Sequence, residues 1–216
     1  MSAETVIPLP SIRRFPGYYY TVTRAIMAGE THISTSDLAR RANLTPIQVR
    51  KDIEYTGVKG RTRIGYPCDE LEQALGKILG LEFEHEYRAV LIGVGSLGGA
   101  LLGHRGFQQY GIRFEAAFDI DVRSEEFRGI PLYEAERMGE IIPSLGVEIA
   151  VLTVPQEAAS AAAQNCVSAG IRGIWNFSGA SLHLELPPRV LVRNIDLGLR
   201  FSSFFAEFHH LERDGR

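Results

Sequence analysis

The residues of this chain best suited to chemistry form a glycine pattern, Gly93-x-Gly95-x-x-Gly98. The apolar run Ala89–Ile92 before it is long enough for a buried parallel strand, and leucines with helical spacing follow it. In such a strand–turn–helix unit, the first glycine allows a tight turn, the second lets the backbone approach a pyrophosphate, and the third lets the helix pack on the strand. The pattern predicts a dinucleotide site at the helix N-terminus, with a phosphate loop made of Gly93, Val94, Gly95, Ser96, Leu97 and Gly98.

An acidic residue stands at the end of the next expected strand, 114–120. Asp119 stands twenty-one residues beyond Gly98, where a carboxylate binds the adenine-ribose 2′-hydroxyl and repels a 2′-phosphate. This placement favours NAD(H) over NADP(H). Asp121 and Arg123 stand close by, so the choice of cofactor remains open at this stage, and we count Asp121 among the candidate cofactor contacts.

Three further runs, 147–154, 171–177 and 190–195, read as later parallel strands, with an alanine-rich helix at 156–169. Together they predict a Rossmann-type α/β fold with a doubly wound parallel sheet. An open sheet of this kind binds its ligand at the carboxyl ends of its strands. The candidate cofactor contacts at those ends are Thr153, Val154, Pro155, Asn176 and Phe177.

The equipment of an enzyme is not evident beside this expected site. The Tyr-x-x-x-Lys pair of Tyr55 and Lys59 precedes the glycine pattern, and little chain remains for a substrate domain. His104 could act as an acid or base, but packing or switching suits its place on the first helix better. Hydride transfer needs a positioned proton partner, so we predict no catalytic residue.

Positive charge is concentrated in the front part of the chain. Residues 10–63 hold ten Arg and Lys against four Asp and Glu, a net charge of +6, whereas the whole chain has −3 and the remainder therefore −9. A basic front on an acidic body is typical of a polyanion-binding protein. The alternative is ordinary solvated surface.

The same front part has the pattern of a helix-turn-helix. We expect helices over 17–28, from the capping residues Ser34–Asp37 to Leu44, and from Thr45-Pro46 to Tyr55, with Gly57 ending the last. Pro46, Val49 and Ile53 would share the core side of the third helix. The opposite side would carry Ile47, Gln48, Lys51 and Tyr55, with Arg50 on the flank.

A glycine-rich basic segment, 58–66, follows and resembles the β-wing of a winged helix. Glutamine can contact adenine, and lysine or arginine can reach guanine or phosphate. The candidate contacts to double-stranded DNA are Thr45, Gln48, Arg50, Lys51, Lys59, Arg61 and Arg63, with Arg13 and Arg14 as a phosphate-binding arm.

These patterns divide the chain into a winged-helix DNA-binding domain (1–84), a Rossmann NAD(H)-binding domain (85–196) and a C-terminal helix (197–216). A connecting helix with Leu71, Leu75, Ile78 and Leu79 leads to a hinge at 80–86. The last helix gathers four phenylalanines on one face, too much apolar surface for a free tail. It would pack on its own domain or, as we favour, on a second subunit of a homodimer.

The composition excludes several other classes of protein. In its 216 residues no apolar run is long enough to cross a bilayer, and the N-terminus lacks the pattern of a signal peptide. The two cysteines and six histidines show no metal-ligand spacing. We therefore expect a cytoplasmic protein with reduced cysteines, no metal and no membrane partner.

Several of these segments together resemble the Rex family of bacterial redox-sensing repressors. The resemblance covers essentially the whole chain, and the segments that carry it are QVRKD (48–52), the wing ending in Gly65-Tyr66, GVGSLG (93–98), AAFDID (116–121), LTVP (152–155) and NID (194–196). It implies a homodimer with a swapped C-terminal helix. It also implies binding to a palindromic operator when NADH is scarce and release when NADH binds.

The chain departs from the family pattern at three places. His104 stands where many members have tyrosine, a residue that in the family contacts the aspartate matching Asp196; these two are our switch candidates. A basic residue of the first helix is replaced within Tyr18–Tyr20, and the wing differs in spacing.

Two other classes remain as alternatives. One is a small NAD-linked oxidoreductase with a basic N-terminal extension. The other is a CoA-binding module of the succinyl-CoA synthetase type, against which Asp119 argues.

Overall fold

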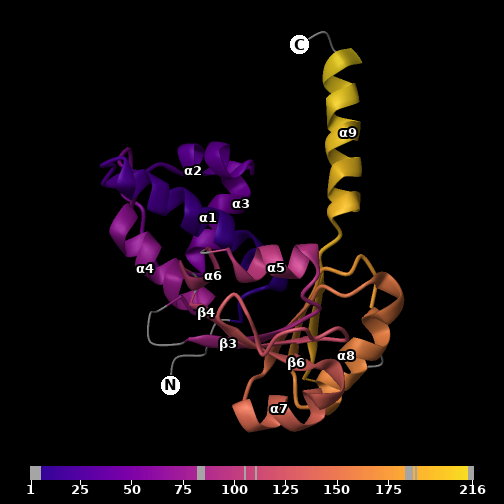
Figure 1. Cartoon of the computed structure of the whole chain (residues 1–216). Coiled ribbons are helices and arrows are strands. Elements are labelled where there is room, and N and C mark those ends of the chain that lie inside the picture. The colour runs from indigo at the N-terminus through magenta and orange to yellow at the C-terminus, as the bar shows by residue number, and fades with distance from the viewer. Residues whose placement is uncertain are drawn as a thin grey trace. The chain divides into compact units, whose positions relative to one another are not determined.

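The computed structural model describes residues 6–81, 86–104, 106–109, 111–182, 187 and 189–213. The chain forms two compact units, Met1–His85 and Glu86–Arg216, which we name the front unit and the rear unit (Figure 1). Most of the expected hinge, residues 82–85, lies outside the described residues.

The front unit is helical with one small sheet. Its elements are α1 (Leu9–Met27), β1 (His32–Ile33), α2 (Thr35–Ala42), α3 (Pro46–Glu54), β2 (Tyr66–Pro67) and α4 (Cys68–Leu79), and β1 pairs with β2 antiparallel. Side chains of all four helices, including Phe15, Leu38, Val49 and Leu71, meet in one buried apolar cluster. Burial of this cluster gives the front unit a core of its own.

Local signals define the helix-turn-helix. Ser34 caps α2, because its side-chain oxygen accepts a hydrogen bond from the Asp37 backbone amide. Asn43 ends α2 in the left-handed conformation (φ 55°). Thr45 and Gln48 form a capping box at the start of α3, as predicted. The sharp turn between the two helices is therefore specified by the residues on either side of it.

Four expectations for the front unit are wrong. The first helix begins at Leu9 rather than at 17, because Pro10 suits its first turn and burial of Phe15 and Tyr18 holds it together across Pro16. Arg13 and Arg14 are therefore helical, not part of an arm. Pro46 is exposed, and the half-buried Tyr55 packs against the core instead of pointing outward.

The wing is shorter than expected. Within 58–66 the structure has one isolated antiparallel bridge, between Arg61 and Gly65. Gly65 has φ +106°, and a Cβ there would overlap the carbonyl group of Ile33. The segment returns so close to β1 that only glycine fits.

The rear unit is built on a seven-stranded sheet. Its strands are β3 (Tyr87–Ile92), β4 (Ile112–Asp119), β5 (Glu126–Phe127), β6 (Ile130–Glu134), β7 (Ile149–Leu152), β8 (Gly173–Asn176) and β9 (Leu191–Asn194). Their order is β5-β6-β4-β3-β7-β8-β9, and every neighbouring pair is parallel except β5 and β6. The six parallel strands have the doubly wound order of a Rossmann sheet, with its switch point between β3 and β7.

Helices cover both faces of this sheet (Figure 1). On one face α7 (Met138–Leu145) and α8 (Ala159–Ser168) pack against Val90 and Ile92. On the other face α5 (Ser96–Leu102) and α6 (Gly106–Gln109) pack against Ala89 and Leu91. The alternation of side chains along β3 thus supplies both cores.

The last helix, α9 (Leu197–Arg213), exposes the apolar face expected from the sequence. Phe201, Phe204, Phe205 and Phe208 are between 47% and 62% exposed in the single chain. The side chain of Leu211 lies outside the described residues.

Candidate functional site

A cavity of about 750 Å³ lies at the carboxyl edge of the rear sheet. It is bounded by the turn after β3, the end of β4, the loop after β7 and the start of the loop after β8. Of the predicted cofactor residues, the cavity is lined by Gly93, Gly95, Leu97, Asp119, Thr153, Val154, Pro155 and Phe177. It therefore lies at the switch point, where a sheet of this order binds its ligand.

The three glycines of the turn have different tasks. Gly93 has φ +94°, and a Cβ there would lie 3.0 Å from the carbonyl oxygen of Thr153. Gly95 has open space where a Cβ would stand, whereas a Cβ on Gly98 would overlap the carbonyl oxygen of Gly93. The turn can thus admit a pyrophosphate at Gly95, while Gly98 serves the packing of α5 on β3.

Asp119 joins the end of β4 to the glycine turn. Its Oδ2 accepts a hydrogen bond of 2.6 Å from the Val94 amide, and its Oδ1 accepts one of 3.1 Å from the Asp121 amide. A carboxylate has about four acceptor sites, so further sites remain for ribose hydroxyls. The arrangement fits an adenine ribose.

Asp121 lies outside the cavity lining. Its Oδ2 is 2.6 Å from Nη2 of Arg123, and both side chains are exposed. The hydrogen bond from Arg123 lowers the pKa of Asp121 below its usual value. Asp121 thus pairs with Arg123 at the surface, where solvent screens both charges.

The opposite end of the cavity carries no formal charge. Thr153, Val154, Pro155 and Phe177 line it, and Thr153 Oγ1 donates a hydrogen bond of 2.6 Å to the carbonyl oxygen of Gly93. The strand order places Asp119 and Phe177 three strand spacings apart, about 14 Å. The cavity thus has an acidic end and an uncharged end, as an extended dinucleotide requires.

The other predicted cofactor residues support the cavity from outside its lining. Val94 holds Asp119. The buried Asn176 orders the loop after β8, because its Nδ2 donates to the Ala180 carbonyl and to Asn194 Oδ1. Ser96 begins α5.

Sequence reasoning missed part of the lining. Ile120, which is 86% exposed, follows Asp119 directly, and Glu136 and Asn165 come from segments where no site residue was predicted. Only Ile120 had a local signal, since it follows the acid at the strand end. The other two come from a 3-10 turn, Ala135–Arg137, and from the face of α8.

The two switch candidates lie in separate local settings. His104 is exposed after α5, and its ring meets Phe107 edge to face at 5.8 Å between centroids. Asp196 Oδ1 accepts a hydrogen bond of 2.9 Å from the Leu199 amide at the start of α9. Among the described residues the structure places no hydrogen bond between these two side chains.

The third helix and the wing of the front unit present the predicted DNA-facing residues. Thr45, Gln48, Arg50, Lys51, Lys59, Arg61 and Arg63 are all exposed, as is Arg13 on α1. The apolar Ile47 and Ile64 are exposed beside them. Such a surface offers cations for phosphates and apolar groups for thymine methyls.

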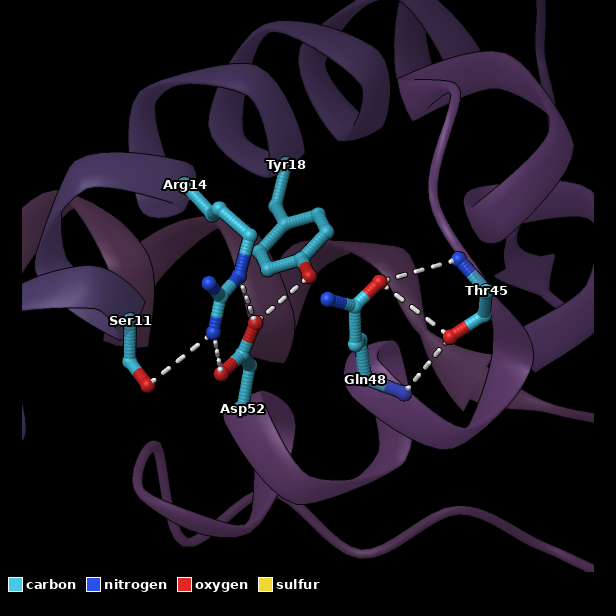
Figure 2. Close-up of polar contacts among 6 residues, drawn as sticks. All are labelled: Ser11, Arg14, Tyr18, Thr45, Gln48 and Asp52. Atoms are coloured by element: carbon cyan, nitrogen blue, oxygen red, sulfur yellow. Dashed lines mark hydrogen bonds and ion pairs between the residues drawn. The ribbon is translucent and has the colours of Figure 1, made fainter.

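Gln48 is engaged in the capping box. The side-chain Oε1 of Gln48 accepts hydrogen bonds of 3.3 and 3.2 Å from N and Oγ1 of Thr45. The backbone amide of Gln48 donates to the same Oγ1 at 3.3 Å. Figure 2 shows the side-chain nitrogen of Gln48 pointing away from Thr45. A two-bond contact to adenine would therefore require Oε1 to leave Thr45.

Arg14 is paired inside the front unit and is not the free cation that the sequence suggested. Its Nε and Nη2 each donate a hydrogen bond of 2.7 Å to Asp52 on α3, and Tyr18 donates a third of 2.7 Å (Figure 2). Burial of Asp52 by itself opposes ionisation, but the hydrogen bonds from Arg14 and Tyr18 prevail, and the pKa of Asp52 lies below its usual value. Arg14 is thus an internal partner of α3 rather than a free cation.

Neither a metal centre nor a membrane segment is found in the part of the chain that the structure describes. No group of three or more His, Cys, Asp or Glu there could hold a metal ion. No helix there is both long and apolar enough to span a bilayer.

Comparisons with known proteins find a match for each of the two units. Residues 84–180 match the family described as "CoA binding domain", and residues 6–53 match "Putative DNA-binding protein N-terminus". A redox-sensing transcriptional repressor Rex from Treponema denticola is 39% identical over 91% of this chain and 93% of its own length. One from Bacteroides fragilis is 34% identical over 97% and 94%.

Solved structures are similar along the whole chain. RSP, a Rex-family repressor, has a TM-score of 0.84 at 29% identity and covers 97% of both chains. RSP in complex with β-NAD+ and operator DNA has a TM-score of 0.82 at 29% identity, and the match covers 97% of this chain and 95% of the RSP chain. RSP in complex with β-NADH has a TM-score of 0.81 at 28% identity, and the match covers 98% of this chain and 100% of the RSP chain.

A DNA-binding domain followed by a Rossmann domain defines a transcription regulator that responds to a nucleotide. With relatives of this identity along nearly its whole length, the chain belongs to the Rex family of redox-sensing transcriptional repressors. Its relatives are repressors and not oxidoreductases, which argues against the first alternative raised from the sequence, a small NAD-linked oxidoreductase.

Proposed function

We propose that this protein represses transcription by binding operator DNA through the front unit and leaves the operator when NADH binds the rear unit. The observation that carries the proposal is one chain with both a dinucleotide cavity at the switch point and an exposed, capped basic helix. Solved relatives with β-NADH, and with β-NAD+ and operator DNA, support the same pair of ligands.

The preference for reduced cofactor follows from the uncharged end of the cavity. NAD+ has a cationic nicotinamide ring, whereas the reduced ring of NADH is neutral and costs less to bury among Val154, Pro155 and Phe177. NADH then shifts the protein toward the released conformation only to the extent that it binds that conformation better, by about 1.4 kcal/mol for each tenfold.

We assign the contacts as follows. The cofactor-binding residues are those predicted from the sequence, with Val94, Ser96, Gly98, Asp121 and Asn176 supporting from outside the lining. Gln48, Arg50 and Lys51 would read bases or flanking phosphates, and Lys59, Arg61, Arg63 and Arg13 would contact the backbone or the minor groove. His104 and Asp196 are the candidates for the switch. The proposed domains of the protein are the DNA-binding domain (1–84), the NAD(H)-binding domain (85–196) and the C-terminal helix (197–216).

The exposed phenylalanine face of α9 suits a second copy of the chain. Four half-exposed phenylalanines on one helix form an apolar patch that soluble monomers rarely leave uncovered. In a two-fold dimer the two α3 helices would read half-sites about 34–36 Å apart or a multiple of that distance, which predicts an inverted repeat. Such a repressor would act in the cytoplasm.

The test is a gel shift with a duplex that the purified protein selects from a random pool. We expect NADH to release this duplex and NAD+ to leave it bound. Equal retention of the duplex with saturating NADH and with no cofactor would overturn the proposal. Steady oxidation of NADH in the presence of a carbonyl substrate would instead support an oxidoreductase.

A further inference from the structure

The α3 helix carries a carboxylate on the side that meets α1. Asp52 is 2% exposed although it lies one position after Lys51, which points to solvent. Burying an ionised carboxylate is costly unless it is paired and hydrogen-bonded. A bare carboxylate on a DNA-facing helix would also repel phosphates, so Asp52 needs both a local partner and a reason to be there.

Both oxygens of Asp52 are bound by groups of α1. Arg14 donates to Oδ2 through Nε and to Oδ1 through Nη2, while Tyr18 OH donates to Oδ2, all at 2.7 Å. Arg14 itself is held by Ser11, with its Nη2 3.3 Å from Ser11 Oγ. Figure 2 shows these groups converging from α1 on the single carboxylate.

This contact fixes a direction that apolar packing leaves loose. Val49 and Ile53 hold α3 to the core through non-directional contacts. A two-bond arginine–carboxylate pair has a planar geometry and tolerates little rotation. Gln48 lies one helical turn before Asp52, and Lys51 directly precedes Asp52. Fixing Asp52 therefore also fixes the directions in which Gln48 and Lys51 point.

From this geometry, and resting on the proposed function, we infer that Asp52, Arg14 and Tyr18 are positioning residues for base recognition. They touch no DNA themselves. They set the rotation of α3 about its axis, and thereby the alignment of Gln48 and Lys51 with base edges. Phosphate contacts tolerate a small rotation because flexible cationic side chains can follow it, so specific binding depends on this pair more than non-specific binding does.

The experiment compares affinity for the selected duplex with affinity for an unrelated duplex of equal length. The double variant R14Q/D52N removes the ion pair and leaves the net charge of the chain unchanged. We expect the ratio of the two affinities to fall by about tenfold or more, within the range of losing one good base contact. Affinity for the unrelated duplex and its salt dependence should stay within about twofold, because the number of phosphate contacts is unchanged.

Arg13→Gln is the matched comparison. Arg13 lies beside Arg14 on the same helix but is exposed, and we have assigned it a phosphate contact. Its loss should weaken both duplexes by a similar factor and lower the salt slope by about 1. Arg13→Gln should therefore leave the affinity ratio unchanged, whereas the double variant should lower it.

Tyr18→Phe keeps the proposal testable if the double variant does not fold. It removes one hydroxyl from a buried ring and should lower the affinity ratio in the same direction by a smaller factor. NADH titration and thermal unfolding of each variant verify that both units are folded at the assay temperature. The inference is overturned if folded R14Q/D52N retains the wild-type ratio, or if its affinities for the selected and the unrelated duplex fall equally. If R14Q/D52N does not fold, the same two outcomes for folded Tyr18→Phe overturn it. If the wild-type chain selects no duplex at all, the proposed function itself has failed.

Discussion

Asp119 at the end of β4 accepts a hydrogen bond from the backbone amide of Val94, 25 positions earlier, at 2.6 Å. The carboxylate thus holds the glycine turn in place and lines the cavity at the same time. One residue thus couples the shape of the glycine turn to the end of the cavity where we propose that the adenine ribose binds.

Asp119→Ala should therefore weaken NADH binding more than the loss of a ribose contact alone. Removing a charged hydrogen-bond partner costs roughly 1.5–3 kcal/mol, or about tenfold to a hundredfold in affinity. We expect duplex binding without cofactor to remain and NADH to release the duplex only at much higher concentration. A fluorescence titration with NADH measures the first effect and a gel shift the second. An unchanged NADH affinity would remove Asp119 from the site.

Gly98→Ala should destabilise the rear unit and impair NADH binding together. The added Cβ would overlap the carbonyl oxygen of Gly93 and lie 2.8 Å from Thr153 Oγ1, and such overpacking costs about 1–3 kcal/mol. Gly139→Ala is the control, because Gly139 is also helical but has no atom within 4 Å of an added Cβ. Differential scanning calorimetry should show a lowered Tm for Gly98→Ala only. Equal effects of the two substitutions would contradict the packing role of Gly98.

The front unit should lose stability in acid through Asp52. The pKa of Asp52 is lower in the folded chain than its ordinary value, because hydrogen bonds from Arg14 and Tyr18 outweigh the effect of burial. Its stabilising contribution is therefore complete above the unfolded pKa, about 4, and is lost as the pH falls through the lowered folded value. Urea unfolding of the wild type and of Asp52→Asn should differ at pH 7 and converge in acid.

Asp37→Asn is the control for this pH dependence. Asp37 also pairs with an arginine, Arg40, at 2.6 Å, but both side chains are exposed. The hydrogen bonds from Arg40 and Ser34 lower the pKa of Asp37 as well, but solvent screens an exposed pair, so Asp37→Asn should differ from wild type less than Asp52→Asn does at every pH. A similar pH dependence for both substitutions would show that burial of Asp52 is unimportant.

The two kinds of basic residue in the front unit should separate by their salt dependence. Lys51→Ala removes a predicted base contact and should weaken the selected duplex by about 1–3 kcal/mol, with a smaller effect on unrelated DNA. Arg61→Ala removes a predicted backbone contact in the wing and should weaken both duplexes together, with a salt slope lower by about 1. Fluorescence anisotropy at several salt concentrations distinguishes them. Equal losses on both duplexes for Lys51→Ala would make Lys51 a phosphate contact.

Local signals explain why much of the molecule was predictable. The capping box of Thr45 and Gln48 fixes the start of α3, and the glycine turn with its flanking strand fixes β3 and α5, because the determinants lie within a few residues. The cavity followed from the order of elements, since the carboxyl ends of parallel strands converge at the switch point.

What the sequence did not reveal depends on contacts between distant residues. Arg14 looked like a free cation, because its partner Asp52 lies 38 positions away on another helix. Pro16 and Gly17 looked like a helix boundary, although burial of Phe15 and Tyr18 carries α1 across them. The hairpin of β5 and β6 and the helix α7 were not predicted, since β5 has only two residues and Pro143 stands inside α7.

The apolar face of α9 gives the last prediction, that Phe204 and Phe208 hold two chains together. Their rings stack at 6.3 Å between centroids and are 57% and 47% exposed in the single chain, so a partner surface would remove both from water. Burying a phenylalanine contributes about 1.5–3 kcal/mol, and F204D/F208D replaces that gain with two desolvated charges. Sedimentation should show a dimer for the wild type and a monomer for the variant. E207Q, on the same helix, is the control and should remain dimeric.

Because one α3 alone reads one half-site, the monomeric variant should also lose most of its affinity for the inverted repeat while still binding NADH. If F204D/F208D sediments as a dimer, α9 is not the interface and the half-site spacing must be set by another surface.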